Sequence, residues 1–171
     1  GSIRRQRQMC IRDRFIPLNT GYTGSEVEYF LNDSECKVFI TTSKMLKELD
    51  SLGKNRSSNM ETIDADYKGS FFSNFNENEP LDFVEGLDED DAAAILYTSG
   101  TTGQSKGAML SQKNLLSNAL TLSKAWGFTP SDILLHALPI YHTHGLFVAT
   151  NIALVSGLSL IHISEPTRPT R

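Results

Sequence analysis

Residues 97–107 read Tyr-Thr-Ser-Gly-Thr-Thr-Gly-Gln-Ser-Lys-Gly, directly after the apolar residues 92–96. Five Ser or Thr hydroxyls, three glycines and one lysine thus fall within one short stretch. Glycine lets a backbone bend through conformations that other residues avoid, and successive N–H groups in such a bend form a concave anion site. The hydroxyls add donors, and Lys106 adds a compact positive charge. The stretch therefore predicts a loop around a polyphosphate. The alternative is a flexible linker, although linkers seldom separate two apolar strand-like runs.

Two widespread phosphate loops do not fit this stretch. A Walker loop needs a glycine, four residues, and then Gly-Lys-Ser/Thr. Here the residue five positions after Gly100 is Ser105, and Lys106 is followed by Gly107. The dinucleotide fingerprint Gly-x-Gly-x-x-Gly is also absent from the stretch. A phosphate loop of another kind is therefore expected.

The stretch resembles the signature loop of the adenylate-forming superfamily, which includes acyl- and aryl-CoA synthetases, luciferases and the adenylation domains of peptide synthetases. That signature runs Tyr/Phe-Thr-Ser-Gly-Ser/Thr-Thr-Gly, one variable residue, Pro, Lys and Gly. The chain departs from it at Ser105, where proline is usual. This departure relaxes the loop but removes no hydrogen-bond donor, so phosphate binding is still expected.

Two further stretches carry the resemblance, which spans residues 15–157. Residues 138–146, Leu-Pro-Ile-Tyr-His-Thr-His-Gly-Leu, resemble the family's next motif in composition and in spacing after the loop. Residues 15–31 resemble the segment that precedes the loop. Among subfamilies, this combination is most similar to the malonyl-CoA synthetases.

The resemblance implies an α/β fold that is part of the multi-layered N-terminal domain of these enzymes, with a mostly parallel sheet flanked by helices, and incomplete. Family members are much longer chains, so residues 15–157 are expected to be a fragment of the AMP-binding N-terminal domain. A sheet cut in this way exposes edges and apolar faces, which makes stability in isolation doubtful.

The two ends of the chain do not follow the family pattern. Residues 1–14 carry five arginines and no apolar period, and residues 158–171 contain Ser-Glu-Pro-Thr-Arg-Pro-Thr-Arg. Both resemble translated sequencing-adapter sequence and are predicted to be non-native tails. An ordinary basic tail is the alternative, and residues 158–163 could instead form a real strand.

Charge argues against nucleic acid as a partner. The chain has 16 Lys and Arg and 20 Asp and Glu; without the seven arginines and two acids of the tails, nine basic and 18 acidic residues remain, a net charge near −9. Nucleic-acid binding needs a basic face. Outside the tails Cys36 is the only cysteine, which leaves no disulfide or CxxC pair. No apolar run reaches membrane-spanning length, and a cytoplasmic protein is expected.

Hydrophobic periodicity predicts alternating helices and strands before the loop. Ser25 is the expected N-cap of a helix that stops near residues 32–33. The β-branched residues 37–42 predict a buried strand. A short helix over 44–52 and a brief strand over 60–63 follow. Eight acids within residues 77–91 predict a solvated surface loop.

The elements around and after the loop are predicted in the same way. Strands are expected over 92–98, 107–110 and 133–138. Ser111 is expected to cap a helix that Gly127 ends. The apolar face of this helix, with Trp126, is predicted to be core. An apolar helix is expected over 146–155.

The resemblance implies a two-step ligase that uses ATP, Mg²⁺ and CoA. A carboxylate attacks the α-phosphate of ATP to give an acyl-adenylate and pyrophosphate, and the CoA thiol then accepts the acyl group. Charge builds on phosphate oxygens in the first step, so the chemistry requires fixed donors and a cation aimed at them. Phosphate contacts are predicted for Thr98, Ser99, Thr101, Thr102 and Lys106, with Gly100, Gly103 and Gly107 shaping the loop. Mg²⁺ would bridge phosphate oxygens, and in this family its protein ligand lies beyond residue 171.

Four histidines follow the loop, and the last of them, His162, lies in the predicted non-native tail. His142 matches a family histidine near the acyl pocket and the α-phosphate, which implies that it orients the carboxylate, as a catalytic and substrate-binding residue. On an extended segment, His144 would face the same side and could hold the distal carboxylate of a dicarboxylate. His136 is expected to be a satisfied structural histidine.

Two alternatives to a ligase stay open, as does the acid itself. One is a metal-binding module built on His142-x-His144, for which His136 is the only nearby third ligand. The other is a non-catalytic nucleotide-binding fragment, because the family's adenine-binding segment, hinge and C-terminal lysine lie outside the chain. The 171 residues alone are therefore expected to make no acyl-CoA. The acid could be malonate, methylmalonate, another short acid or the substrate of another acyl- or aryl-CoA ligase, and the oligomeric state is open.

Overall fold

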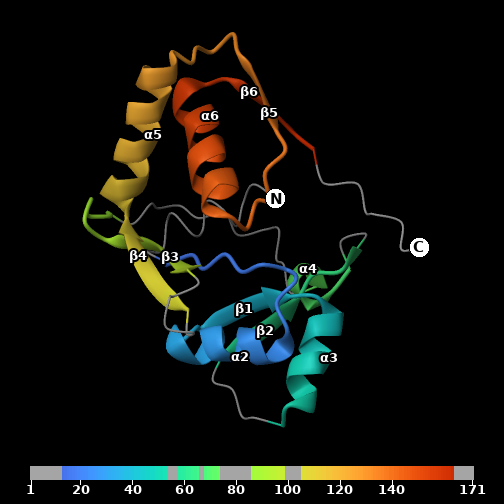
Figure 1. Ribbon diagram of the computed structural model, residues 1–171. Helices are drawn as coiled ribbons and strands as arrows, with labels where there is room; N and C mark the ends of the chain where they lie inside the picture. Colours follow the sequence, from blue (N-terminus) through green and yellow to red (C-terminus); the bar gives the residue numbers. More distant parts are fainter. Residues whose placement is uncertain (1–12, 54–57, 66–67, 74–85, 99–104, 164–171) are drawn as a thin grey trace. The chain divides into compact units, whose positions relative to one another are not determined.

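A computed structural model describes residues 13–53, 58–65, 68–73, 86–98 and 105–163. These residues belong to two compact units (Figure 1). The first unit comprises residues 1–19 and 83–171, and the second comprises residues 20–82.

The second unit packs helices against a two-stranded parallel sheet. Its helices are α2 (Gly24–Asp33), α3 (Ser43–Ser51) and the short α4 (Ser70–Ser73). Strands β1 (Val38–Thr41) and β2 (Asn59–Thr62) pair in parallel register. Burial of Val27, Leu31 and Leu49 forms the core between α2 and α3.

Two predictions for this unit are wrong in detail. Thr23, rather than Ser25, caps α2, because the Thr23 hydroxyl accepts a hydrogen bond from Glu26 N at 3.4 Å and the Glu26 carboxylate accepts from Thr23 N at 2.8 Å. This reciprocal capping box is stronger than a lone serine cap. The strand predicted over 37–42 forms, but Val38 is 51% exposed and Ile40 is 44% exposed. The other face of the strand, with Phe39 and Thr41, is partly buried.

The first unit contains the predicted glycine-rich stretch on an antiparallel hairpin. Strand β3 (Ala92–Thr98) pairs with β4 (Lys106–Ser111). On the other edge of β3, Phe15 forms a parallel bridge to Ala94, with Phe15 N donating to Ala93 O at 2.9 Å. Strand β3 therefore has neighbours on both sides.

A parallel pair and three helical segments complete the unit. Strand β5 (Ile133–His136) pairs with β6 (Ser159–His162). Helix α5 (Gln112–Trp126) packs on α6 (Thr150–Ser156), which continues the π-helix η2 (His144–Ala149) (Figure 1). The α/β class, with small parallel sheets, helices and an incomplete sheet, is confirmed. No helix of the described residues is long and apolar enough to cross a bilayer.

Helix α5 begins and ends where the sequence predicts, but its apolar face is not core. Ser111 is the N-cap, and Gly127 ends the helix in the left-handed region with φ of 70°. Ala119 is buried, whereas Trp126 is 60% exposed, and Leu116 and Leu120 are exposed as well. The prediction that this face is core is therefore wrong for Leu116, Leu120 and Trp126, whereas Leu115 and Leu122 are partly buried beside Ala119.

The segment after residue 157 forms the strand that the sequence left open as an alternative. Leu158 is 8% exposed, and β6 runs beside β5 from Ser159. The non-native origin proposed for residues 158–171 and 1–14 stays a prediction. Residues 1–12 and 164–171 lie outside the described part of the chain.

Candidate functional site: a hairpin tip and a histidine turn

Thr98 and Lys106 face each other at the loop end of the β3–β4 hairpin. Directly opposed residues of an antiparallel pair project to the same side of the sheet, with Cβ atoms about 5 Å apart. Both residues are exposed. The hairpin thus brings a hydroxyl and an ammonium together at the point where the chain turns. The other predicted loop residues lie outside the described part of the chain: Ser99, Gly100, Thr101, Thr102 and Gly103.

Gly107 lies one rung below this end, opposite Tyr97. A Cβ at this position would come within 2.8 Å of Ile95 Cγ2 and 3.4 Å of the Tyr97 ring. The backbone of Gly107 does not have a positive φ. Glycine is therefore needed here for close packing across the hairpin, which is a different reason from the loop flexibility that the sequence suggested.

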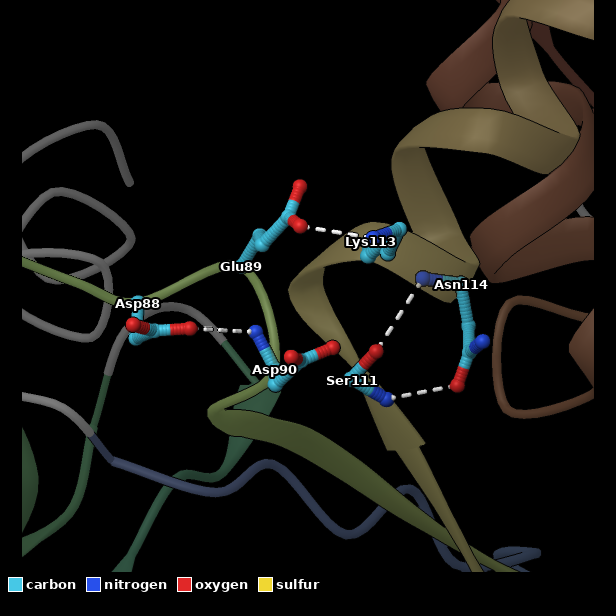
Figure 2. A network of polar contacts seen from close by, with 6 residues as sticks. All are labelled: Asp88, Glu89, Asp90, Ser111, Lys113 and Asn114. Carbon is cyan, nitrogen blue, oxygen red and sulfur yellow. Dashed lines mark hydrogen bonds and ion pairs between the residues drawn. The ribbon is translucent and has the colours of Figure 1, made fainter.

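The base of the hairpin is fixed to the start of α5 by an acidic turn (Figure 2). Gln112 N donates to Asp91 O at 3.0 Å, and Lys113 N donates to Glu89 O at 2.8 Å. The Lys113 ammonium lies 2.6 Å from the Glu89 carboxylate. These carbonyls satisfy N–H groups of the first helical turn that have no partner within the helix. The described end of the acidic run is exposed, as predicted, and also anchors α5.

A capping box closes the same junction. Ser111 Oγ accepts from Asn114 N at 3.2 Å, and Asn114 Oδ1 accepts from Ser111 N at 3.0 Å (Figure 2). Sequence reasoning identified Ser111 but missed Asn114, although the spacing Ser-x-x-Asn is that of a capping box with an amide in place of Glu or Gln. The base of the hairpin is thus held by backbone and side-chain bonds, with the predicted phosphate loop at its other end.

The histidine pair lies on a tight turn that leads into η2. His142 N donates to Pro139 O at 3.1 Å, and Leu146 N donates to His142 O at 2.9 Å. Thr143 has helical backbone angles, φ −48° and ψ −47°. The prediction of an extended segment is therefore wrong, because these turn bonds coil the chain. The rings of His142 and His144 nevertheless stack, with centroids 5.4 Å apart and planes at 15°.

One contact within this pair defines the useful tautomer of His142. His144 N donates to His142 Nδ1 over 3.4 Å, a long bond. Because Nδ1 accepts, a neutral His142 ring carries its proton on Nε2. Both side chains are exposed. The turn therefore offers an N–H donor to an incoming carboxylate, beside a second imidazole.

His136 is the satisfied structural histidine that the sequence predicts. It is 3% exposed, with Nε2 at 3.0 Å from Gly145 O and Nδ1 at 2.7 Å from His162 Nδ1. Both ring nitrogens are therefore engaged, which removes His136 as a third ligand for a His-x-His metal site. Within the described ranges, no group of three or more His, Cys, Asp or Glu could hold a metal ion.

Comparisons with known proteins identify the family of the chain. A family model described as AMP-binding enzyme matches residues 14–171. The chain is 33% identical over 148 residues to a CoA ligase of Gibberella moniliformis, covering 85% of this chain and 24% of the relative. It is 31% identical over 137 residues to a malonate–CoA ligase of Arabidopsis thaliana, covering 78% and 22%.

A solved structure of a similar protein also matches the chain. ATP-bound MatB from Rhodopseudomonas palustris matches with a TM-score of 0.77 at 45% identity, over 88% of this chain and 30% of that chain. The chain spans less than a third of the length of each of these proteins. Together with the hairpin and the histidine turn, the match over nearly all residues leads to one conclusion: the chain belongs to the AMP-binding enzyme family.

Proposed function

We propose that this chain is the phosphate-binding and acid-binding part of an AMP-forming acyl-CoA ligase. The observation that carries the proposal is the hairpin that presents Thr98 and Lys106 side by side at the two ends of the Ser-Gly-Thr-Thr-Gly loop. The enzyme would join a carboxylic acid to the α-phosphate of ATP, release pyrophosphate, and pass the acyl group to the CoA thiol. The family match and the names of the relatives support this reaction class.

In this proposal Lys106 acts on the β- and γ-phosphates. Departure of pyrophosphate increases negative charge on the oxygens that the loop faces, so a fixed cation and hydroxyl lower the barrier most when they are already in place. The short hairpin provides that preorganisation, because Thr98 and Lys106 belong to the last rung of a ladder fixed at its base by α5. Ser99, Thr101 and Thr102 would add further donors.

The histidine turn supports a short dicarboxylate, such as malonate, as the acid. The Nε2–H of His142 would donate to the reacting carboxylate and hold it for attack on the α-phosphate. The His144 ring, stacked at 5.4 Å, would bind the distal carboxylate. A monocarboxylate would leave this second imidazole without an anionic partner, so the stacked pair favours a diacid. The malonate–CoA ligase among the relatives supports the same choice.

Acid-dependent exchange of pyrophosphate into ATP tests the proposal. We define the family-length enzyme as a ligase of full family length that carries residues 15–163 of this chain. Malonate and methylmalonate should support exchange in it better than acetate or propionate. His144→Ala should raise the malonate KM about tenfold while the ATP KM changes by less than about twofold.

The outcomes separate the two parts of the proposal. Equal effects of His144→Ala on both KM values would reject the distal-carboxylate role of His144. Exchange driven best by a monocarboxylate would reject the diacid and leave the ligase chemistry in place. Absence of exchange with every acid would reject adenylation itself.

A further inference from the structure

We propose that His136 is a positioning residue for the acid: it holds the Gly145 carbonyl and thereby determines where His142 points. This inference rests on the proposed function, because it concerns the same acid-binding turn. His136 does not belong to the predicted contact set, and its exposed fraction of 3% keeps it from substrate. Its action would therefore be transmitted through the backbone.

The contact between His136 and Gly145 has a defined direction. A carbonyl oxygen only accepts hydrogen bonds, so His136 Nε2, at 3.0 Å from Gly145 O, must carry a proton. In the neutral ring Nδ1 is then the acceptor, and it faces His162 Nδ1 at 2.7 Å. His136 is the last residue of β5. The donor therefore comes from a strand that is hydrogen-bonded to β6.

Gly145 is held on its other side by Pro139. A Cβ at position 145 would lie 2.2 Å from Pro139 O and 2.9 Å from Pro139 C, so the two backbones are in direct contact. The same Pro139 oxygen accepts from His142 N at 3.1 Å. Thr150 Oγ1 also donates to Gly145 O, at 3.0 Å, from within the helical segment that follows. His136 is the donor that ties this carbonyl to the sheet.

His142 therefore lies between two fixed points, Pro139 and Gly145. Removing the His136 donor leaves the Gly145 carbonyl bonded to Thr150 but takes away its link to β5. The turn that carries His142 and His144 should therefore shift relative to the strand. A displacement of about 1 Å in a group that orients a reactant can lower a rate by as much as about a hundredfold. We propose that His142 holds the acid and that the hairpin holds ATP, so the acid KM should change more than the ATP KM.

The test compares two substitutions in the family-length enzyme. His136→Phe fills the buried site without a donor, and His136→Gln keeps an N–H near the position of Nε2. His136→Phe should raise the acid KM about tenfold with the ATP KM within about twofold of wild type, and His136→Gln should restore most of the loss. If His136→Phe does not fold, His136→Asn replaces it, because its shorter amide cannot reach Gly145. The acid KM of His136→Gln should then be lower than that of His136→Asn.

A double substitution separates positioning from general support of the fold. If His136 acts through His142, adding His136→Phe to His142→Ala should not raise the acid KM further. Additive effects in this cycle would overturn the inference. So would a wild-type acid KM in His136→Phe beside an impaired His142→Ala, and the proposed function would then survive. An unchanged acid KM in His142→Ala would overturn both this inference and the acid-holding role proposed for His142, and the adenylation chemistry would stay in place.

Discussion

Gly145 and Gly127 illustrate two separate reasons for glycine in this chain. Gly127 ends α5 with φ of 70°, and nothing lies within 4 Å of the place its Cβ would take. Gly145 has no left-handed φ, but a Cβ there would enter the backbone of Pro139. The first position is restricted by the conformation of one residue. The second is restricted by the packing of the turn that carries the histidines.

Alanine at these two positions should therefore have unequal effects on the free energy of unfolding. Gly127→Ala should cost about 1 kcal/mol, the usual cost of a left-handed alanine. Gly145→Ala should cost about 3 kcal/mol or more, because backbone has to move. Urea unfolding of the two variants of the family-length enzyme measures both values. Equal losses would contradict the contact between Gly145 and Pro139.

The sequence indicates candidate site residues where a side chain carries a reactive or charged group, and not where the proposed action passes through the backbone. Thr98 and Lys106 stand out because a hydroxyl and a lysine flank a glycine-rich stretch, and the hairpin pairs them. His136 gives no such signal. Its partner is the carbonyl of Gly145, nine residues away, and a carbonyl has no sequence signature.

At the scale of elements, the junction between β4 and α5 fixes the hairpin. Ser111 ends the strand and caps the helix, Asn114 completes the box, and the turn at Asp91 satisfies Gln112 N. Ser111 thus belongs to both β4 and the start of α5. Loss of its cap should weaken the helix start and the base of the hairpin together.

Ser111→Ala should lower the free energy of unfolding of the family-length enzyme by about 1 kcal/mol, the usual value of an N-cap. Ser117→Ala is the matched control, because the Ser117 hydroxyl only donates to Asn114 O on the exposed helix surface. That change should stay within about 0.5 kcal/mol of wild type. A loss at Ser117 as large as that at Ser111 would show that the cap has no special role.

Element positions were more predictable than element burial. The bounds of β3 match the prediction, since an apolar run is followed at once by polar residues and glycine. The start of α2 was misplaced because Thr23 and Ser25 are both good caps, and Glu26 selects the first. Burial of β1 and α5 was overestimated. An apolar face shows which side of an element can be covered, but it does not show whether anything in the chain covers it.

At the scale of the whole molecule, the chain is two compact units rather than one. One unit is defined by contacts within residues 20–82, and the other by contacts within residues 1–19 and 83–171. The boundary at residues 82–83 falls within the acidic run 77–91, which the sequence predicts to be a surface loop but not a boundary between units. The relatives and the matched structure are all more than three times as long as the segment that this chain covers.

Turnover should therefore belong to the family-length enzyme. The 171-residue chain by itself should form no acyl-CoA from malonate, ATP and CoA, because the hairpin and the histidine turn supply only part of the contacts that both half-reactions need. Detection of malonyl-CoA by mass separation, with the family-length enzyme as positive control, measures this. Acyl-CoA made by the isolated chain would contradict the expectation.

The most direct measurement of the central claim is pyrophosphate exchange in Lys106→Ala and Lys113→Ala variants of the family-length enzyme. Both lysines are exposed and belong to the same unit, but Lys106 ends the hairpin and Lys113 pairs with Glu89. Lys106→Ala should lower kcat/KM for ATP at least about tenfold, since it removes the cation that we propose faces the departing pyrophosphate. Lys113→Ala should stay within about twofold of wild type, because exposed ion pairs contribute little. Undiminished exchange in Lys106→Ala would contradict the account.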